Sequence, residues 1–444
     1  MSYANEIYEN LVKKFPEEKE FHQTAKEVLE SISVVIEENE ELYRKNALLE
    51  RLVEPERSVI FRVPWEDDNG VVHVNTGYRV QFNGAIGPYK GGLRFHPSVR
   101  LGTMKFLAFE QTFKNSLTGL PIGGGKGGSD FDPIGKSDNE IRRFCVSFMT
   151  ELYRHIGPDR DVPAGDLGVS GKEIGYLFGQ YRRIKGCYEN GVITGKALSF
   201  GGSKIRPEAT GYGITYFLQE MLADRNDKIE GKTIAISGCG NVAWGAAKKM
   251  VELGAKVVTL SDPSGYIYDP NGLNDEKVEY MLEIRANNLP IETFAKKFNL
   301  EFVKGKRPWE KKVDIVVPCA TQNELEIEDA KKLVENGTII ICEGSNMPCS
   351  LDATEYIEKN GITLGPSKAA NAGGVAVSAL EMSQDSMRYH WSEEEVDAKL
   401  LGIMKEIFAQ SKQMSVKYNT TLSQGANIAG FIKVADAMLK QGNY

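Results

Sequence analysis

Three lysines near one another in the chain have unusual neighbours. Lys126 lies inside the glycine run 121–128, Lys90 lies between an aromatic residue and two glycines, and Lys114 follows a phenylalanine. A solvated surface lysine needs no such neighbours, so the glycines on both sides of Lys126 indicate close approach of the backbone to a ligand. A lysine desolvated beside other cations has a lowered pKa, and it can act as a base or polarise a carbonyl near neutral pH. The other two lysines suit the two carboxylates of a dicarboxylic substrate. Any one lysine is more often a solvated surface charge than a functional residue. That explanation fits poorly for three lysines that all lie beside glycines or aromatic residues.

An aspartate is the second candidate for acid–base chemistry. Asp166 stands in the run Pro-Ala-Gly-Asp-Leu-Gly at 163–168. A residue in such a run can serve as a turn or helix-cap residue. Spacing alone supports that role and a catalytic role equally.

A glycine turn further along the chain predicts a dinucleotide site. The apolar residues before Ser237 lead into Gly238, and a helical pattern begins after Gly240. Gly238 permits the tight turn, Gly240 lets backbone N–H groups approach a pyrophosphate, and the small Ala243 lets helix and strand pack. The helix N-terminus then places partial positive charge at the phosphates. A second strand ends at Asp262, and this complete order favours a dinucleotide site over an unrelated glycine-rich turn.

Periodic patterns place these motifs on an α/β framework. The chain is helical in pattern up to about residue 51, and alternation at 57–63 and 71–82 predicts a hairpin at the edge of a first sheet. A helix is expected at 142–153, and a small, polar stretch at 195–203 marks a domain boundary. Beyond residue 231 strands alternate with helices, which predicts a mostly parallel sheet covered on both faces. The expected strands are 233–237, 256–260, 315–318, 338–342 and 363–366, and the chain after 393 is largely helical.

Composition excludes several classes of protein. The chain of 444 residues has 54 basic and 61 acidic side chains and a formal charge of −7, which argues against general nucleic-acid binding. No apolar run approaches the ~20 residues of a membrane span, and no signal-peptide core is expected at the start, so a soluble intracellular protein is predicted. Six cysteines form no CxxC pair and five histidines show no ligand spacing, so neither disulfides nor a metal is expected.

Several long motifs resemble one known family. The runs at 87–95, 121–128, 161–166 and 238–243 resemble the short-subunit, hexameric bacterial glutamate dehydrogenases, members of the Glu/Leu/Phe/Val dehydrogenase family, and so do 206–213, 318–323, 346–348 and 368–378. The resemblance covers nearly the whole chain in the same order. It implies an α/β substrate and oligomerisation domain at 1–202, a Rossmann dinucleotide domain at 203–420, and a C-terminal helix within 421–444 that packs back on the first domain. It also implies a cytoplasmic homohexamer.

The resemblance assigns roles at matching positions. Lys126 resembles the family's catalytic lysine and Asp166 its proton-shuttling carboxylate, in the reversible conversion of L-glutamate to 2-oxoglutarate and ammonium. Gln111 and Lys114 would hold the substrate α-carboxylate, whereas Lys90 and Ser378 would hold the γ-carboxylate. The residues implied to contact substrate also include Arg206 and Asn371. The residues implied to contact the dinucleotide are Thr210, Gly238, Cys239, Gly240, Asn241, Val242, Ser261, Asp262, Arg285, Ala320, Thr321, Asn346 and Asn371.

Two arguments about the cofactor oppose each other. An acidic residue at the end of the second strand ordinarily binds the ribose 2′-hydroxyl, so Asp262 favours NAD(H). The resemblance favours NADP(H), because Ser261-Asp262 and Cys239 are similar to the NADP-using bacterial members. Ser261 can donate to a 2′-phosphate and Arg285 can neutralise it, although 288–291 lacks a further basic residue. NADP(H) is therefore expected, with NAD(H) as the alternative.

Two other functions fit the same fold. A dehydrogenase for branched-chain or aromatic amino acids needs an apolar side-chain pocket, and a buried Lys90 without a carboxylate partner would be costly there. A catalytically dead dinucleotide-binding scaffold has no reason to keep both Lys126 and Asp166. The sequence therefore favours glutamate as substrate.

Overall fold

The computed structural model describes residues 2–442, which divide into two compact units. Unit 1 contains the chain up to Lys204, Val377–Val396 and the chain from Asn427 onward, whereas unit 2 contains Ile205–Ala376 and Asp397–Ala426. This division differs from the expected limits of 1–202, 203–420 and 421–444, because 377–396 lies with unit 1 and 421–426 with unit 2. Those limits remain a proposal. A composition change marks a boundary in a loop, but here three boundaries fall within helices.

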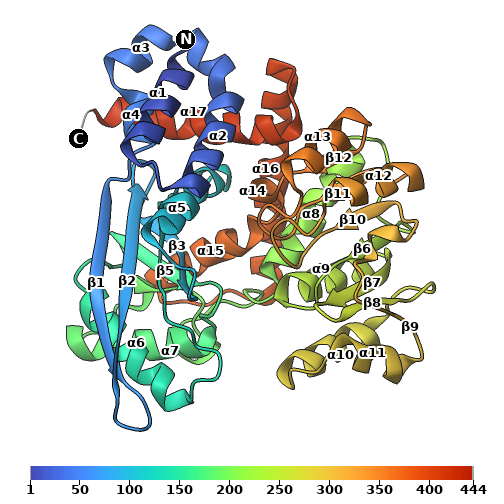
Figure 1. Ribbon diagram of the computed structural model, residues 1–444, viewed down its shortest axis with the longest axis horizontal. Helices are drawn as coiled ribbons and strands as arrows, with labels where there is room; N and C mark the ends of the chain where they lie inside the picture. The colour runs from blue at the N-terminus through green and yellow to red at the C-terminus, as the bar shows by residue number, and fades with distance from the viewer. Residues whose placement is uncertain (1, 443–444) are drawn as a thin grey trace. The chain divides into compact units, whose positions relative to one another are not determined.

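Unit 1 is built on a mixed five-stranded sheet of order β1-β2-β4-β3-β5. The predicted hairpin is confirmed: β1 and β2 pair antiparallel along their length, with β1 at the edge, and form the two long arrows of Figure 1. β4 pairs antiparallel with β2 and parallel with β3, and β5 pairs parallel with β3. The strands are β1 (Arg57–Glu66), β2 (Val72–Asn83), β3 (Tyr89–Phe95), β4 (Gly123–Ser129) and β5 (Asp161–Gly165).

The glycine run around Lys126 is strand β4 rather than a loop. A Cβ on Gly124 would lie 2.0 Å from Oγ1 of Thr112, which belongs to helix α5 (Leu101–Leu117). The glycine at this position is therefore required for close packing of a helix on the strand. The expectation that a ligand explains the glycines is corrected in this respect, because the protein itself fills the space over Gly124.

Helices cover this sheet and supply the core of unit 1. Helices α6 and α7 begin with capping boxes, in which Ser137 pairs with Glu140 and Ser170 with Glu173. Their apolar faces pack with side chains of β1 and β3 in one buried cluster. Of the remaining helices, α1 and α2 are amphipathic, whereas α3 and α4 are short. The bounds are α1 (Tyr3–Lys14), α2 (Lys19–Glu38), α3 (Glu40–Lys45), α4 (Leu48–Leu52), α6 (Asp138–Leu152) and α7 (Gly171–Lys185), with 3-10 turns η1 (Asn190–Val192) and η2 (Leu198–Phe200).

Unit 2 has the predicted Rossmann-type, mostly parallel sheet, of order β12-β11-β10-β6-β7-β8-β9. Neighbours from β12 to β7 run parallel, and β8 and β9 add an antiparallel edge that the sequence patterns did not predict. All five predicted strands are present, although most are shorter than expected. The strands are β6 (Thr233–Ile236), β7 (Lys256–Asp262), β8 (Gly265–Tyr268), β9 (Glu301–Lys304), β10 (Ile315–Val317), β11 (Ile340–Cys342) and β12 (Thr363–Gly365).

The helices of unit 2 mostly alternate with its strands, as the sequence predicts, except that β8 follows β7 directly and α11 follows α10 directly. They are α8 (Ala209–Ala223), α9 (Asn241–Glu252), α10 (Asp275–Ala286), α11 (Ile291–Phe298), α12 (Ile327–Asn336), α13 (Leu351–Lys359) and α14 (Ser367–Ala370), with the 3-10 turn η3 (Pro308–Glu310). Three further helices carry the chain from one unit to the other: α15 (Gly373–Met387), α16 (Glu393–Tyr418) and α17 (Leu422–Gln441). Among residues 2–442, no helix is both long enough and apolar enough to span a bilayer.

Candidate active site

A buried lysine and an aspartate meet in unit 1. The Nζ atom of Lys126 lies 3.0 Å from Oδ2 of Asp166, and the Lys126 side chain is only 8% exposed. The same oxygen accepts a hydrogen bond of 2.8 Å from Nε of Arg94 on β3. Asp166 follows directly after β5, so three neighbouring segments of the sheet deliver these groups. No role was predicted for Arg94 from the sequence, although this residue lies in the motif at 87–95.

The charges of this group shift both pKa values downward. Burial lowers the pKa of Lys126; the Asp166 carboxylate opposes that change, and Arg94 and Arg79 add to it. Burial acts to raise the pKa of Asp166, but the cations Lys126 and Arg94 outweigh it and hold this pKa at about 2. Asp166 is therefore a carboxylate at neutral pH. Lys126 gives up its proton more readily than an ordinary lysine, as expected of a catalytic base.

A second buried ion pair of unit 1 includes Arg79, whose charge also lowers the pKa of Lys126. Arg79 on β2 forms a bidentate pair with Asp161 on β5, with 2.9 Å between Nε and Oδ2 and a second bond between Nη2 and Oδ1. Its Nη1 donates to the carbonyl of Gly91 at 3.0 Å, and both side chains of the ion pair are fully buried. No role was predicted for this pair from the sequence. Its partners are 82 residues apart, so local spacing carries no signal for it.

Lys90 is a second buried ammonium in unit 1, with 1% of its surface exposed. Its Nζ donates to the carbonyl of Val162 at 3.0 Å and to Oγ1 of Thr194 at 2.8 Å. Asn115 on α5 donates to the backbone carbonyl of Lys90 at 3.0 Å and accepts from Gln111 at 2.6 Å. The remaining residue expected at the α-carboxylate, the half-buried Lys114, lies on the same helix.

The expected substrate residues divide between the two units. Unit 1 contains Lys90, Gln111, Lys114, Lys126, Asp166 and also Ser378, which is 1% exposed on α15. Arg206 and Asn371 belong to unit 2 with the expected dinucleotide residues.

The glycine turn of unit 2 has the geometry that a dinucleotide needs. Gly238 has a φ of +82°, a left-handed conformation that favours glycine. Gly240 caps the N-terminus of α9, and a Cβ added there would meet no atom within 4 Å. Asn241 begins the helix, Val242 is half-buried, and Ala243 is fully buried against the strand. Open space over a helix N-terminus fits a pyrophosphate.

Further expected residues gather at the carboxyl ends of neighbouring strands. The segment after β10 carries the exposed Ala320 and Thr321, and the one after β11 carries Asn346. Asn371 donates to Oδ1 of Asn346 at 3.0 Å, but its own buried Oδ1 has no hydrogen-bond partner. A buried acceptor without a partner fits a ligand donor. β6 lies between β10 and β7, which is the switch point where such sheets bind dinucleotides.

Two expected residues near the start of unit 2 lie beside α15. A Cβ on Gly374 would lie 2.4 Å from Oγ1 of Thr210 and 3.8 Å from Nη1 of Arg206. Thr210 thus closely approaches the backbone at Gly374, and Arg206 lies within ordinary contact distance of it.

A pocket of about 370 Å³ lies beside the glycine turn. Its wall includes Cys239, Asp262 and Arg285. Oδ1 of Asp262 accepts from N and Oγ of Ser264 at 2.7 and 2.5 Å, and Oδ2 accepts from the Ile291 N–H at 2.7 Å. These hydrogen bonds to Asp262 therefore stabilise its own loop and the start of α11.

The neighbouring polar groups of this pocket are also tied to the turn. The Oγ of the buried Ser261 accepts the Gly238 N–H at 2.8 Å, which leaves the hydroxyl hydrogen as the group that Ser261 can offer to a phosphate. Arg285 donates to the side chain of Asn241 at the helix start. The pocket therefore presents one cation next to the phosphate-binding turn.

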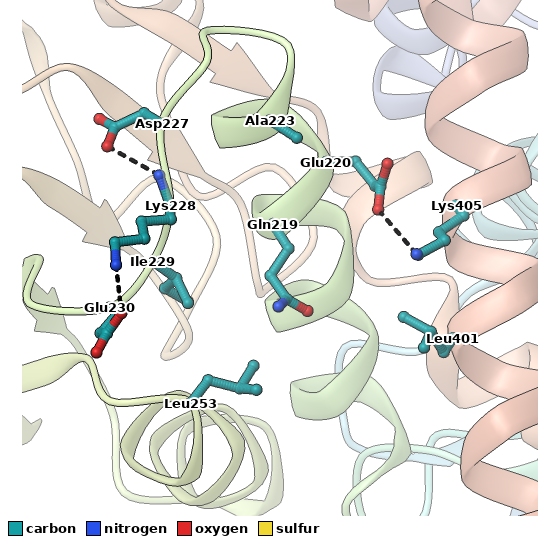
Figure 2. A pocket seen from close by; sticks show the side chains of 10 residues that line it. All are labelled: Gln219, Glu220, Ala223, Asp227, Lys228, Ile229, Glu230, Leu253, Leu401 and Lys405. Atoms are coloured by element: carbon teal, nitrogen blue, oxygen red, sulfur yellow. Dashed lines mark hydrogen bonds and ion pairs between the residues drawn. The ribbon is translucent and has the colours of Figure 1, made fainter.

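Another pocket of unit 2, of about 430 Å³, lies away from these motifs (Figure 2). Its charged side chains pair with one another, as Lys228 does with Glu230 at 2.5 Å and Lys405 with Glu220 at 3.7 Å. We assign no ligand to it.

The described part of the chain contains neither a cluster of metal-ligating side chains nor a disulfide bond. Within residues 2–442 no three His, Cys, Asp or Glu side chains are grouped so that they could hold a metal ion. All six cysteines are free thiols.

A Rossmann unit with an open glycine turn, together with a buried lysine–aspartate pair, defines a dinucleotide-dependent oxidoreductase. Residues 201–442 match the family model described as Glutamate/Leucine/Phenylalanine/Valine dehydrogenase, and residues 55–183 match its dimerisation domain. The chain is 58% identical to the NAD-specific glutamate dehydrogenase of Clostridium symbiosum, with 99% of each chain covered. It is 56% identical to the NADP-specific glutamate dehydrogenase of Haemophilus influenzae, covering 96% of this chain and 95% of the relative. A solved structure of a glutamate dehydrogenase superposes with a TM-score of 0.98 at 58% identity, covering 100% of this chain and 99% of the other.

The chain therefore belongs to the Glu/Leu/Phe/Val dehydrogenase family, and within it to the glutamate dehydrogenases. It is an NAD(P)-dependent oxidoreductase, and its relatives include both NAD-specific and NADP-specific enzymes.

Proposed function

We propose that the chain catalyses the reversible oxidative deamination of L-glutamate to 2-oxoglutarate and ammonium, with Lys126 and Asp166 as its catalytic residues. The observation that carries the roles is the 3.0 Å contact between these two side chains in a setting that lowers the pKa of the lysine. A second buried ammonium, that of Lys90, suits a substrate with a second carboxylate.

The substrate is held at both of its ends. Lys114 and Gln111 on α5 bind the α-carboxylate, and Lys90 with Ser378 binds the γ-carboxylate. The family resemblance implies that Arg206 and Asn371 also contact the substrate. A dicarboxylate fixed at two points presents its α-carbon in a defined orientation, which lowers the entropic part of the barrier.

Proton transfer then falls to the buried pair. Neutral Lys126 accepts a proton at Nζ as the amino group of glutamate becomes an iminium, and bound nicotinamide supplies the hydride acceptor. Water that attacks the iminium carbon loses its proton to a carboxylate oxygen of Asp166. This carboxylate is a weak base while Lys126 is charged, because that charge is the largest factor lowering its pKa. Lys126 must therefore release to solvent the proton that it accepted before Asp166 takes the proton of the water, and Asp166 is then the stronger base.

For the cofactor we propose a preference for NADP(H), with NAD(H) as the alternative. Two observations support this choice. The carboxylate of Asp262 already accepts three hydrogen bonds from its own loop and α11, so it is not dedicated to a ribose hydroxyl. Arg285 lines the same pocket and can neutralise a 2′-phosphate. The dinucleotide would be held by Gly238–Gly240, Asn241, Val242, Ser261, Thr210, Ala320, Thr321, Asn346 and Asn371.

Initial rates of reductive amination test both proposals together. 2-Oxoglutarate and ammonium are supplied with NADPH or NADH in parallel. A higher kcat/KM with NADPH is expected. A higher value with NADH would overturn the cofactor proposal and leave the reaction intact, whereas no rate with either would overturn the reaction.

We also propose that the chain forms a homohexamer in the cytoplasm. The hairpin of β1 and β2 supports assembly, because the edge strand β1 exposes Ile60 (56%) and β2 exposes Val72 (64%) and Val74 (62%). Apolar side chains beside an open strand edge favour pairing with another chain. Light scattering on the purified protein is expected to give six times the mass of one chain, and a monomeric mass would contradict the proposal.

A further inference from the structure

The ammonium of Lys90 is positioned by a loop of unit 1 that the sequence motifs do not include. Oγ1 of Thr194 accepts from Nζ of Lys90 at 2.8 Å, and the Thr194 N–H donates to the carbonyl of Pro163 at 3.0 Å. Thr194 is fully buried. The position of the loop around Thr194 therefore sets where the Lys90 ammonium lies.

One carboxylate on α15 holds this loop. Glu381 accepts the Gly195 N–H at 3.0 Å, the Lys196 N–H at 3.3 Å and the Lys196 ammonium at 2.8 Å. The left-handed conformation of Gly195, with φ of +85°, allows the loop to present these consecutive N–H groups. The side chains of Glu381 and Lys196 are fully buried. A carboxylate with three charge-assisted donors holds its partners in a defined geometry.

A second carboxylate one turn further along α15 completes the cluster. Asp385 accepts from Nζ of Lys196 at 2.9 Å and from Nδ2 of Asn190 at 2.6 Å. Lys196 also donates to the carbonyl of Ile193 at 2.6 Å. Burial raises the pKa of Asp385 to about 7, against the opposing effect of Lys196. Burying one cation with two carboxylates is costly, so stability alone gives a poor reason for this cluster.

The same helix carries the other residue proposed for the γ-carboxylate. Ser378 lies three positions before Glu381 on α15, which places the two on neighbouring turns of one helix face. We infer that Glu381, together with Lys196 and Asp385, is a positioning cluster that fixes Lys90 and Ser378 in register and so determines the preference for a substrate with a second carboxylate. The inference rests on the proposed function, because it assigns the γ-carboxylate to those two residues.

Glu381→Gln tests the inference, since it keeps the shape of the side chain and removes its charge. The readout is the ratio of kcat/KM for 2-oxoglutarate to that for 2-oxopentanoate, which has a methyl group in place of the second carboxylate. The ratio is expected to fall by about tenfold or more, through a higher KM for 2-oxoglutarate, because small misplacements of binding groups are expensive. Rates with 2-oxopentanoate and the KM values for ammonium and dinucleotide are expected to change little.

Two further variants keep the test decisive. Glu18→Gln breaks another buried ion pair of unit 1, that of Glu18 with Lys105 at 2.8 Å, and is expected to leave the ratio unchanged. Thr194→Val removes only the hydroxyl that meets Lys90, so it is expected to lower the ratio even if Glu381→Gln does not fold. An equal loss with both substrates in Glu381→Gln, or an unchanged ratio in Thr194→Val, would overturn the inference. Failure of the proposed function is distinguishable, because the parent enzyme itself would then show no preference for 2-oxoglutarate.

Discussion

The ammonium of Lys126 and the carboxylate of Asp166 lie 3.0 Å apart, and Arg94 shares the same carboxylate oxygen. These two cations keep Asp166 ionised, and burial together with the charge of Arg94 makes Lys126 easier to deprotonate. The pair therefore combines a base ready to accept a proton with an anion that becomes more basic once Lys126 is neutral.

Replacing Lys126 by alanine is expected to remove turnover and leave dinucleotide binding intact. Loss of a positioned acid–base group lowers kcat by about 10²–10⁴-fold. Stopped-flow or steady-state rates give kcat, and fluorescence titration gives dinucleotide affinity. Lys136→Ala, at an exposed position, serves as the matched control. Turnover of Lys126→Ala within a few-fold of the parent would contradict the mechanism and agree with a scaffold role.

The pH profile of glutamate oxidation tests the part that Arg94 plays. The reaction needs neutral Lys126, so kcat/KM is expected to rise with pH through the lowered pKa of this lysine. Arg94 contributes to that lowering. Arg94→Gln removes a positive charge, raises the pKa of Lys126 and shifts the rising limb to higher pH. Arg143→Gln, which breaks an exposed pair with Asp68, is expected to leave the limb in place. A limb that does not move, or moves to lower pH, in Arg94→Gln would exclude this coupling.

Replacing Lys90 by leucine is expected to change substrate preference. The change removes the ammonium proposed for the γ-carboxylate and leaves an apolar side chain in a buried position. Activity with aliphatic amino acids such as norvaline should then increase relative to glutamate. The comparison of kcat/KM for both substrates measures this, and a preserved preference for glutamate would show that the second carboxylate binds elsewhere.

Arg285→Ala tests the proposed 2′-phosphate site. Because an arginine–phosphate contact is specific to NADP(H), KM for NADPH is expected to rise by about tenfold, and KM for NADH should change little. Equal effects on both cofactors would place the contribution of Arg285 in the turn, through Asn241, rather than at a 2′-phosphate.

The structural features predicted best from the sequence are those that depend on residues close together in the chain. The βαβ unit around Gly238 is confirmed because a turn, a helix start and two strands leave their pattern within about thirty residues of chain. The hairpin of β1 and β2 is confirmed for the same reason. Strand β4 was not predicted, because a strand of glycines has no alternation of apolar side chains and its partners come from distant segments.

The buried ion pairs that support the site could not be predicted from the sequence, for a related reason. Arg79 and Asp161 are 82 positions apart, and Lys196 and Glu381 are 185 positions apart. Each residue alone resembles an ordinary surface charge, and only the fold brings the partners together. Composition likewise does not show that α15, α16 and α17 each begin in one unit and end in the other, because the helical pattern of residues continues across the boundary.

We conclude that this enzyme oxidises an amino acid with a second carboxylate. The most direct test is the initial rate of dinucleotide reduction by L-glutamate and by L-norvaline, which has the same carbon chain without that carboxylate. A kcat/KM for glutamate that exceeds the norvaline value by about 10²-fold or more is expected, since a site built to bind a carboxylate rejects a substrate that lacks it. Equal values, or a preference for norvaline, would contradict it.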